Sequence, residues 1–300
     1  MSEPIQHLGL TPGIHYGISE ANYHADLLCD RPTLSRSEAK VILEQSPLHL
    51  WAKHPRLGAH GEKKVTKAMD FGSASHAIAL GQGADIVAVD ADNWQTKDAR
   101  AQRDAIRESG KTPLLQKDLD AANQTVGALW QRLKEFNLYD KFTAAKSEVV
   151  LLWDESDHCS CRVMADKLLI DEENGTADFF DIKFTDSANP KWLPRHFVDM
   201  GYALQEQFYI HGLEQVLPKF AGRMTFTFIL QETEYPFVMV PVRLSGEFRG
   251  ASISKVMRAT DTWGKCRQAN RWPGYTKEIL TLEAPEWLLA QEIGAQNFKL

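Results

Sequence analysis

Apolar residues along this 300-residue chain follow two patterns: short runs typical of buried strands and longer stretches with helical spacing. The runs that predict strands lie at residues 149–153, 161–170, 177–184, 224–230 and 237–242. The stretches that predict the main helices lie at residues 35–50, 69–80, 199–217 and 246–268. Acidic, hairpin-like turns join the first three strands, whereas a helix separates the third strand from the fourth. This order predicts an α/β fold with a central mixed β-sheet flanked by helices.

Local signals define the segments around this core. Ser35 and Glu38 have the spacing of a capping box, so the first helix is expected to begin there, and Pro47 interrupts its apolar stripe. The remaining segments are an expected irregular arm (1–30), a basic loop (54–66), a helical insert (95–137) and a C-terminal tail (271–300). We interpret residues 1–300 as a single domain.

Composition narrows the class of protein. Apolar residues make up 43% and charged residues 25%, which is typical of a soluble globular protein with a full core. No run approaches the ~20 apolar residues of a membrane helix, and the N-terminal residues lack the pattern of a secretory signal. The 4 cysteines are scattered, which argues against a zinc or iron–sulfur site. We therefore expect a cytoplasmic protein with no membrane partner.

The charge balance argues mildly against a nucleic-acid-binding protein, because the net charge is -6 and such proteins are more often basic. Two local stretches, 53–67 and 249–271, are nevertheless basic. Either stretch could track a phosphate backbone or be only a solvated face.

Two aspartates and a lysine carry the most informative chemistry. Asp166 and Asp181 are fifteen residues apart, about the length of one hairpin, and adjacent antiparallel strands lie ~4.8 Å apart. Their carboxylates could therefore share a divalent cation such as Mg2+, with the Ile182 carbonyl as a further ligand. Lys183 points to the same strand face as Asp181 and could orient an attacking water. These residue types predict a metal-dependent phosphodiesterase that cuts nucleic acid.

Other polar residues lie where they could complete this site. Glu148 opens the first central strand, and His76 on the preceding helix could be a further ligand. Gln205 and Tyr209 are four residues apart and share a helix face, from which they could hold Lys183 or contact a phosphate. Motifs for a serine hydrolase, a P-loop and a dinucleotide-binding loop are missing from the sequence.

The order of these motifs resembles the PD-(D/E)XK nuclease superfamily, which has a restriction-endonuclease-like core. The matching segments, in chain order, are Gly72-Ser73-Ala74-Ser75-His76, Glu148, Asp166, Asp181-Ile182-Lys183 and Gln205-x-x-x-Tyr209. Within the superfamily, residues 20–245 look most like the RecE-type exonucleases related to lambda exonuclease and the RecB nuclease domain. The chain departs from that pattern at Met164-Ala165, where Arg-Pro is usual, and at Phe184, where threonine is usual.

The resemblance implies a Mg2+-dependent exonuclease that degrades one strand of linear double-stranded DNA from its 5′ end, with Mn2+ able to substitute. It also implies a ring-like homo-oligomer and a RecT-like single-strand annealing protein as partner. The implied metal ligands are His76, Asp166 and Asp181, beside the Ile182 carbonyl named above. The implied catalytic residues are Lys183, Glu148, Gln205 and Tyr209. Arg31 or Arg36 is the candidate for binding a 5′ phosphate, and Ser73 is a further candidate for binding substrate.

Two other functions fit the same core. One is an endonuclease, or a nuclease that acts on single strands or flaps. The other is a catalytically silent subunit that binds DNA or an annealing protein without cutting. The presence of Asp166, Asp181 and Lys183 argues against this alternative.

Overall fold

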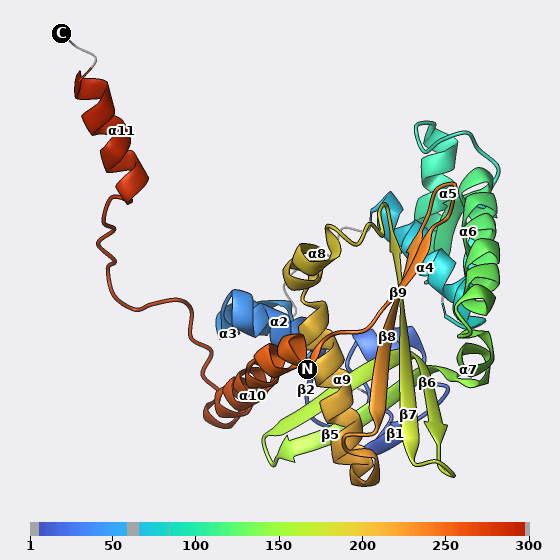
Figure 1. Ribbon diagram of the computed structural model, residues 1–300, viewed down its shortest axis with the longest axis horizontal. Helices are drawn as coiled ribbons and strands as arrows, with labels where there is room; N and C mark the ends of the chain where they lie inside the picture. The colour runs from blue at the N-terminus through green and yellow to red at the C-terminus, as the bar shows by residue number, and fades with distance from the viewer. Residues whose placement is uncertain (1–5, 59–65, 84, 298–300) are drawn as a thin grey trace.

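A mixed β-sheet forms the centre of the structure, a computed structural model that describes residues 6–58, 66–83 and 85–297 (Figure 1). Its strands among these residues are β1 (Gly13–His15), β2 (Thr33–Ser35), β5 (Lys146–Ser156), β6 (Cys159–Asp171), β7 (Thr176–Thr185), β8 (Met224–Glu232) and β9 (Met239–Val242). They lie in the order β1-β5-β6-β7-β8-β9, and β2 pairs with β6 beside this path. β5, β6 and β7 form antiparallel hairpins, whereas β8 runs parallel to β7. The predicted mixed sheet is confirmed.

Helices cover both faces of this sheet (Figure 1). In the described part of the chain they are α1 (Glu20–His24), α2 (Arg36–Glu44), α3 (Pro47–Lys53), α4 (Lys67–Leu80), α5 (Lys97–Glu108), α6 (Gln116–Glu135), α7 (Tyr139–Ala144), α8 (Leu193–Met200), α9 (Tyr202–Val216), α10 (Gly246–Ala269) and α11 (Glu286–Asn297). Adjacent strand residues face opposite sides: Phe179 packs in the core under α9 and α10, and Phe180 packs in the core under α4, α6 and α7. The predicted layers of helices around the sheet are thus confirmed.

Several expected segments contain more structure than the sequence pattern predicted. The expected irregular arm contains β1 and α1, which begins at the capping residue Ser19. The expected helical insert also contains a strand, β4 (Thr112–Leu115), which pairs in parallel with β3 (Ile86–Val89) in a separate small sheet. Part of the expected basic loop, 59–65, lies outside the described residues.

Two expected helices differ in their bounds from the structure. The expected helix 35–50 breaks at Gln45, just before Pro47, because proline cannot supply the backbone donor that a continuous helix needs. The expected helix 199–217 corresponds to α9, and α8, which precedes it, was not expected. Gly201 separates the two helices, and its φ of 70° is a left-handed conformation that favours glycine. The capping box of Ser35 and Glu38 is confirmed at the start of α2.

Within the described residues, no helix is both long enough and apolar enough to span a lipid bilayer. The C-terminal segment extends away from the body and ends in α11 (Figure 1).

Candidate active site

The candidate site lies where β6 changes partner. Near its start β6 pairs with β2, through Ser160–Arg162, and near its end it pairs with β7, from Lys167 onward. Asp166 lies between these two ladders, so its side chain borders a gap between diverging strands. Its Oδ2 accepts a hydrogen bond of 2.8 Å from the Ile182 backbone N–H. This bond provides an acceptor for the buried Ile182 N–H, which lies beyond the end of the β6–β7 ladder.

Asp181 lies beside Asp166 and is 2% exposed. Its Oδ1 accepts a hydrogen bond from the Gln205 amide, and its Oδ2 is 2.5 Å from the Lys183 ammonium. Burial raises the pKa of Asp181, the Lys183 charge lowers it, and the Asp166 charge raises it again. Burial lowers the pKa of Lys183, but the two carboxylates outweigh this effect and raise it overall. Lys183 therefore stays cationic, which suits it to orienting a water rather than to accepting a proton.

α4 brings His76 to the same gap. His76 Nδ1 is 3.7 Å from Asp166 Oδ2, and the ring packs edge-on against Phe184. Ser73 is one turn earlier on the same helix, is exposed, and borders the same cavity. The expectation that the helix at 69–80 carries polar residues to the paired aspartates therefore matches the geometry.

Glu148 lies across from Asp166 on the neighbouring strand. The ladder pairs Ser147 with Lys167 and Val149 with Ala165, which places Glu148 opposite Asp166. Its φ of 50° is unusual for a residue other than glycine and marks an irregularity in β5. Burial, with the nearby carboxylates of Glu20 and Asp166, raises the pKa of Glu148 to about 7. A carboxyl held in this way can exchange a proton near neutral pH.

Gln205 and Tyr209 project from α9 toward these strands but make different contacts. Gln205 accepts a 2.6 Å hydrogen bond from Arg36 and donates one to Asp181, so it links the α2 N-terminus to the carboxylate. The Tyr209 hydroxyl donates a 2.9 Å bond to the Met164 carbonyl and so ties α9 to β6.

The structure brings nearly all of the expected site residues to one cavity of about 390 Å³. Those that line it are Arg36, Ser73, His76, Glu148, Asp166, Asp181, Lys183, Gln205 and Tyr209. Arg31 lies elsewhere: its guanidinium pairs with Asp154 at 2.8 Å in a different pocket. The structure therefore does not support Arg31 as a substrate-binding residue of this cavity.

Three further residues of the cavity, Glu20, Tyr23 and His24, were missed because they belong to the expected irregular arm. Ser19 at the N-cap of α1 was the local signal, since its side chain accepts a hydrogen bond from the Asn22 N–H.

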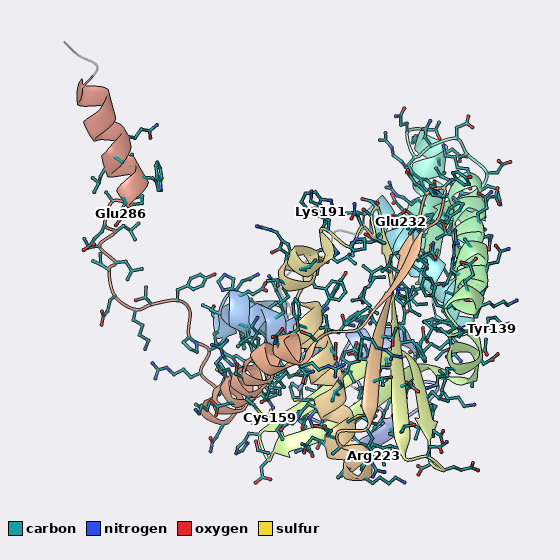
Figure 2. The ribbon with its side chains drawn as sticks, viewed as in Figure 1. Tyr139, Cys159, Lys191, Arg223, Glu232 and Glu286 are labelled. Carbon is teal, nitrogen blue, oxygen red and sulfur yellow. The ribbon has the colours of Figure 1, made fainter. Side chains whose placement is uncertain are left out.

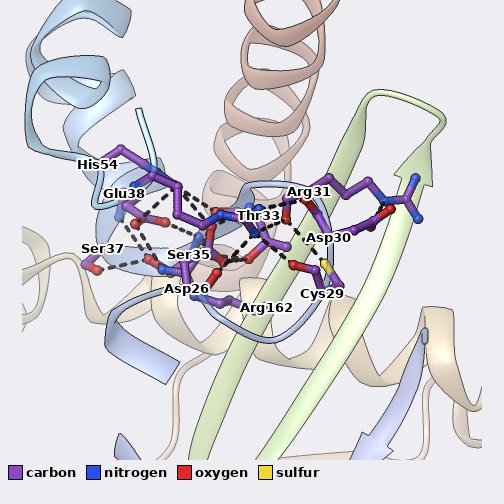
Figure 3. Close-up of polar contacts among 11 residues, drawn as sticks. Asp26, Cys29, Asp30, Arg31, Thr33, Ser35, Ser37, Glu38, His54 and Arg162 are labelled. Carbon is purple, nitrogen blue, oxygen red and sulfur yellow. Dashed lines mark hydrogen bonds and ion pairs between the residues drawn. The ribbon is translucent and has the colours of Figure 1, made fainter. Parts of the chain in front are cut away.

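A buried ion network behind the cavity was also missed (Figure 3). Arg162 on β6 is 2% exposed and pairs with Asp26 at 3.1 Å and Glu38 at 3.0 Å. Glu38 in turn accepts a hydrogen bond from the Ser35 N–H, so the network fixes the first turn of α2. Arg36, which borders the cavity, lies in that turn. Sequence spacing alone gave no sign of this pairing, because Arg162 and Glu38 are 124 residues apart.

The donor set fits a hard divalent cation. Among the described residues, Asp181 Oδ2 pairs with Lys183 alone, and two carboxylates face this one lysine. In a strand, the N–H and C=O of one residue point to the same side, so the Ile182 carbonyl faces the side of its N–H partner, Asp166. No three His, Cys, Asp or Glu side chains of the described residues converge into a full ligand set. Mg2+ accepts such a site because it keeps several waters.

Acids and a lysine at a divergence of strands, supported by a glutamine from the following helix on a mixed α/β fold, form an arrangement that suits a nuclease site. A family model described as a PDDEXK-like domain of unknown function matches residues 35–285, so the chain belongs to this family. The resemblance to the PD-(D/E)XK superfamily is thereby confirmed, whereas the RecE-type branch stays a prediction. PD-(D/E)XK nucleases in general depend on a divalent metal.

Among solved structures, the chain is similar to the crystal structure of a "Putative exonuclease" from Eubacterium rectale. The TM-score is 0.57 at 12% sequence identity, and the match covers 93% of this chain and 100% of that one. At this identity the similarity shows a shared fold. No curated protein matches the chain.

Proposed function

We propose that this protein is a Mg2+-dependent exodeoxyribonuclease that degrades one strand of linear double-stranded DNA in the 5′-to-3′ direction. The observation that carries the proposal is the convergence of Asp166, Asp181 and Lys183 on one cavity, with Gln205 hydrogen-bonded to Asp181. The family match and the fold of the Eubacterium rectale protein support a nuclease. The DNA-end specificity and the polarity rest on the resemblance to RecE-type enzymes.

In this proposal Asp166 and Asp181 hold the cation, with His76 and the Ile182 carbonyl beside them. Bound Mg2+ would polarise the scissile phosphate and lower the pKa of a coordinated water, and Mn2+ could replace it. Lys183 orients the attacking water and offsets charge on the phosphate. The hydrogen bonds from the Ile182 N–H and the Gln205 amide hold the two carboxylates in position.

The substrate phosphate is expected to meet Arg36 and Ser73 at the cavity wall. Arg36 uses one nitrogen to bind Gln205, and the opposite side of a planar guanidinium remains suited to a phosphate oxygen. Glu148, with its pKa raised to about 7, is placed to exchange a proton near the acidic pair.

The exposed single strand would serve recombination by strand annealing. A RecT-like annealing protein is the expected partner, and a ring-like homo-oligomer would keep the enzyme on its DNA. The annealing partner and the ring-like homo-oligomer are both expected from the resemblance to RecE-type enzymes.

A comparison of linear, nicked and covalently closed circular DNA tests this function. With Mg2+, the protein should digest linear duplex and spare closed circles, and EDTA should stop the reaction. Cleavage of closed circles would indicate an endonuclease, and preference for single strands or flaps would indicate a different substrate. DNA binding without cleavage in Mg2+ or Mn2+ would indicate a silent subunit.

A further inference from the structure

The C-terminal segment leaves the body of the protein after α10. Its first part is anchored on α3, where the Leu48 N–H donates to the Pro273 carbonyl at 3.1 Å and the His49 and Tyr275 rings lie 5.3 Å apart. Beyond Tyr275, the described side chains through Gln291 are exposed. Figure 2 shows Glu286, at the start of α11, well apart from the body. We refer to residues 276–291 as the tail.

The tail is unusually apolar for a segment without packing partners. Its large apolar side chains, with their exposed fractions, are Ile279 (100%), Leu280 (65%), Leu282 (86%), Trp287 (68%), Leu288 (37%) and Leu289 (52%). Contiguous apolar exposure of this kind marks a surface that another surface covers. Trp287 is the kind of residue that dominates binding energy at interfaces.

A groove of about 310 Å³ lies on the body between α2, α8, α9 and α10. Its apolar lining comes mainly from Leu43, Phe197, Leu204 and Phe248. Val198 also lines it and is 59% exposed, although it is a large apolar residue. Phe197 and Leu204 are buried, so the accessible apolar surface of the groove comes from Val198 and from the half-buried Leu43 and Phe248.

The groove and the tail carry opposite charges. Lys255 and Arg258 on α10 are exposed at the groove, and neither pairs with an acidic side chain of the described residues. Lys40, also at the groove, is already engaged by Glu44 at 3.7 Å and by the Asp199 carbonyl. The tail carries three glutamates, at 278, 283 and 286, against one lysine, at 277. An acidic, apolar segment thus matches a basic, apolar groove.

We propose that the tail of one copy of this chain docks in the groove of a second copy. In the structure the tail extends away from the body and leaves the groove of its own chain open, although its anchor on α3 follows α2, which lines that groove. A tail held off its own groove in this way is available to the groove of a second copy. A contact of tail to groove is head-to-tail, and such contacts close into a ring when the rotation between copies permits. The proposal does not rest on the nuclease activity.

The test measures the oligomeric state of the full-length chain by sedimentation velocity over a range of concentrations. The tail variant carries Leu282→Glu and Trp287→Glu, and the groove variant carries Lys255→Glu and Arg258→Glu; all four positions are exposed. The wild type should assemble, and each variant should raise the apparent dissociation constant about tenfold or more. The matched control is Lys265→Glu, on the same helix but outside the groove, and it should assemble as the wild type does.

One mixture and one combined variant identify the occupant of the groove. An equimolar mixture of the tail variant and the groove variant should form mixed dimers, because one intact tail and one intact groove remain. Adding Glu283→Lys and Glu286→Lys to the groove variant should restore assembly by reversing both charges. Cleavage activity that persists in the monomeric variants would leave the proposed function standing whatever the outcome here.

The proposal is overturned if the wild type is monomeric at every concentration, or if the tail and groove variants assemble normally. It is also overturned by a combined result: the tail and groove variants form no mixed dimers, and the groove variant with Glu283→Lys and Glu286→Lys sediments as a compact monomer. That result would mean that the tail occupies the groove of its own chain.

Discussion

The Ile182 backbone N–H donates a 2.8 Å hydrogen bond to Oδ2 of Asp166, and this bond holds Asp166 beside Asp181. Ile182 is buried, so its N–H would lose its partner if the carboxylate were removed. The Asp166 side chain therefore belongs to the acidic pair and also accepts a backbone hydrogen bond where β6 and β7 separate.

This double role predicts different results for two substitutions of Asp166. Asp166→Asn keeps an acceptor oxygen for the Ile182 N–H, so it should retain stability while losing metal-dependent cleavage. Asp166→Ala should lose cleavage and also about 1–3 kcal/mol of stability, because it leaves a buried donor unpaired. Chemical denaturation of both variants measures the difference. Equal stability of the two variants would contradict the proposed role of this bond.

Lys183 should be required for cleavage. Lys183→Met removes the cation beside Asp181 and should lower the rate by about 10²–10³-fold, the usual loss for one charge-stabilising donor. Lys191→Met is the control, because Lys191 is exposed in the loop before α8. Initial rates on linear duplex at saturating Mg2+ make the comparison. A Lys183→Met enzyme as fast as the Lys191→Met control would remove Lys183 from the chemistry.

Gln205 is expected to act through Asp181. Gln205→Ala removes the amide that binds this carboxylate and frees Arg36, so activity or metal affinity should fall about 10–100-fold. The reduced affinity should show as a higher Mg2+ concentration for half-maximal rate. Gln215→Ala, at an exposed position on the same helix, should leave this concentration unchanged. An unchanged Mg2+ dependence in Gln205→Ala would mean that the glutamine serves only the fold.

The buried network around Arg162 should contribute strongly to stability. Arg162→Met leaves Asp26 and Glu38 without their cation, and removing one partner of a buried ion pair costs about 3–5 kcal/mol. Thermal denaturation measures this loss. Arg195→Met, at an exposed ion pair on α8, should change stability by less than about 1 kcal/mol. Similar melting temperatures for both variants would show that the network is not a stabilising one.

The ion pair of His211 and Glu155, which lies outside the candidate site, should make the stability of the fold depend on pH. The hydrogen bond to Glu155 raises the pKa of His211 above its usual 6.5. The stability that His211 contributes is therefore present at low pH and is lost as pH rises through the raised pKa. Burial raises the pKa of Glu155, but the bonds from His211 and Trp153 lower it overall, below its usual 4.5. Its contribution is therefore lost as pH falls through the lowered value. The pair stabilises the fold most between about pH 4.5 and 6.5.

His211→Gln should thus lose about 1.5–3 kcal/mol at pH 5.5 and less at pH 9, the usual range for a hydrogen bond between charged groups. Melting temperatures of the variant and the wild type, compared at both pH values, check this. A loss that is constant with pH would show that His211 is not charged in the fold.

The parts of the fold that depend on local pattern could be predicted from the sequence. The hairpins β5–β6–β7 were predicted because alternating apolar residues are separated by polar turns, and the start of α2 was predicted because Ser35 and Glu38 form a capping box. α8 was missed, because a helix of 8 residues carries little periodicity of its own. The β3–β4 pair was missed because short strands carry little periodicity.

The candidate site was predictable in its residue types but not in its contacts. The spacing of Asp166, Asp181 and Lys183 placed them on one hairpin, and the structure brings them to one cavity. Spacing cannot show that Gln205 contacts Asp181 and Arg36, because such contacts depend on how α2 and α9 pack over the sheet. Arg31 was misplaced for the same reason: Asp154 binds it at the other end of the β5–β6 hairpin.

The most direct test of the central claim follows the release of label from linear duplex DNA labelled at either end, in Mg2+, by wild-type protein and by Asp181→Asn. The account predicts progressive release from the 5′ end by the wild type, none with EDTA, and none by the variant, which should keep the wild-type circular dichroism spectrum. Asp186→Asn, at an exposed position after β7, should cleave as the wild type does. Digestion by Asp181→Asn at the wild-type rate would contradict the claim that Asp166, Asp181 and Lys183 form the catalytic centre.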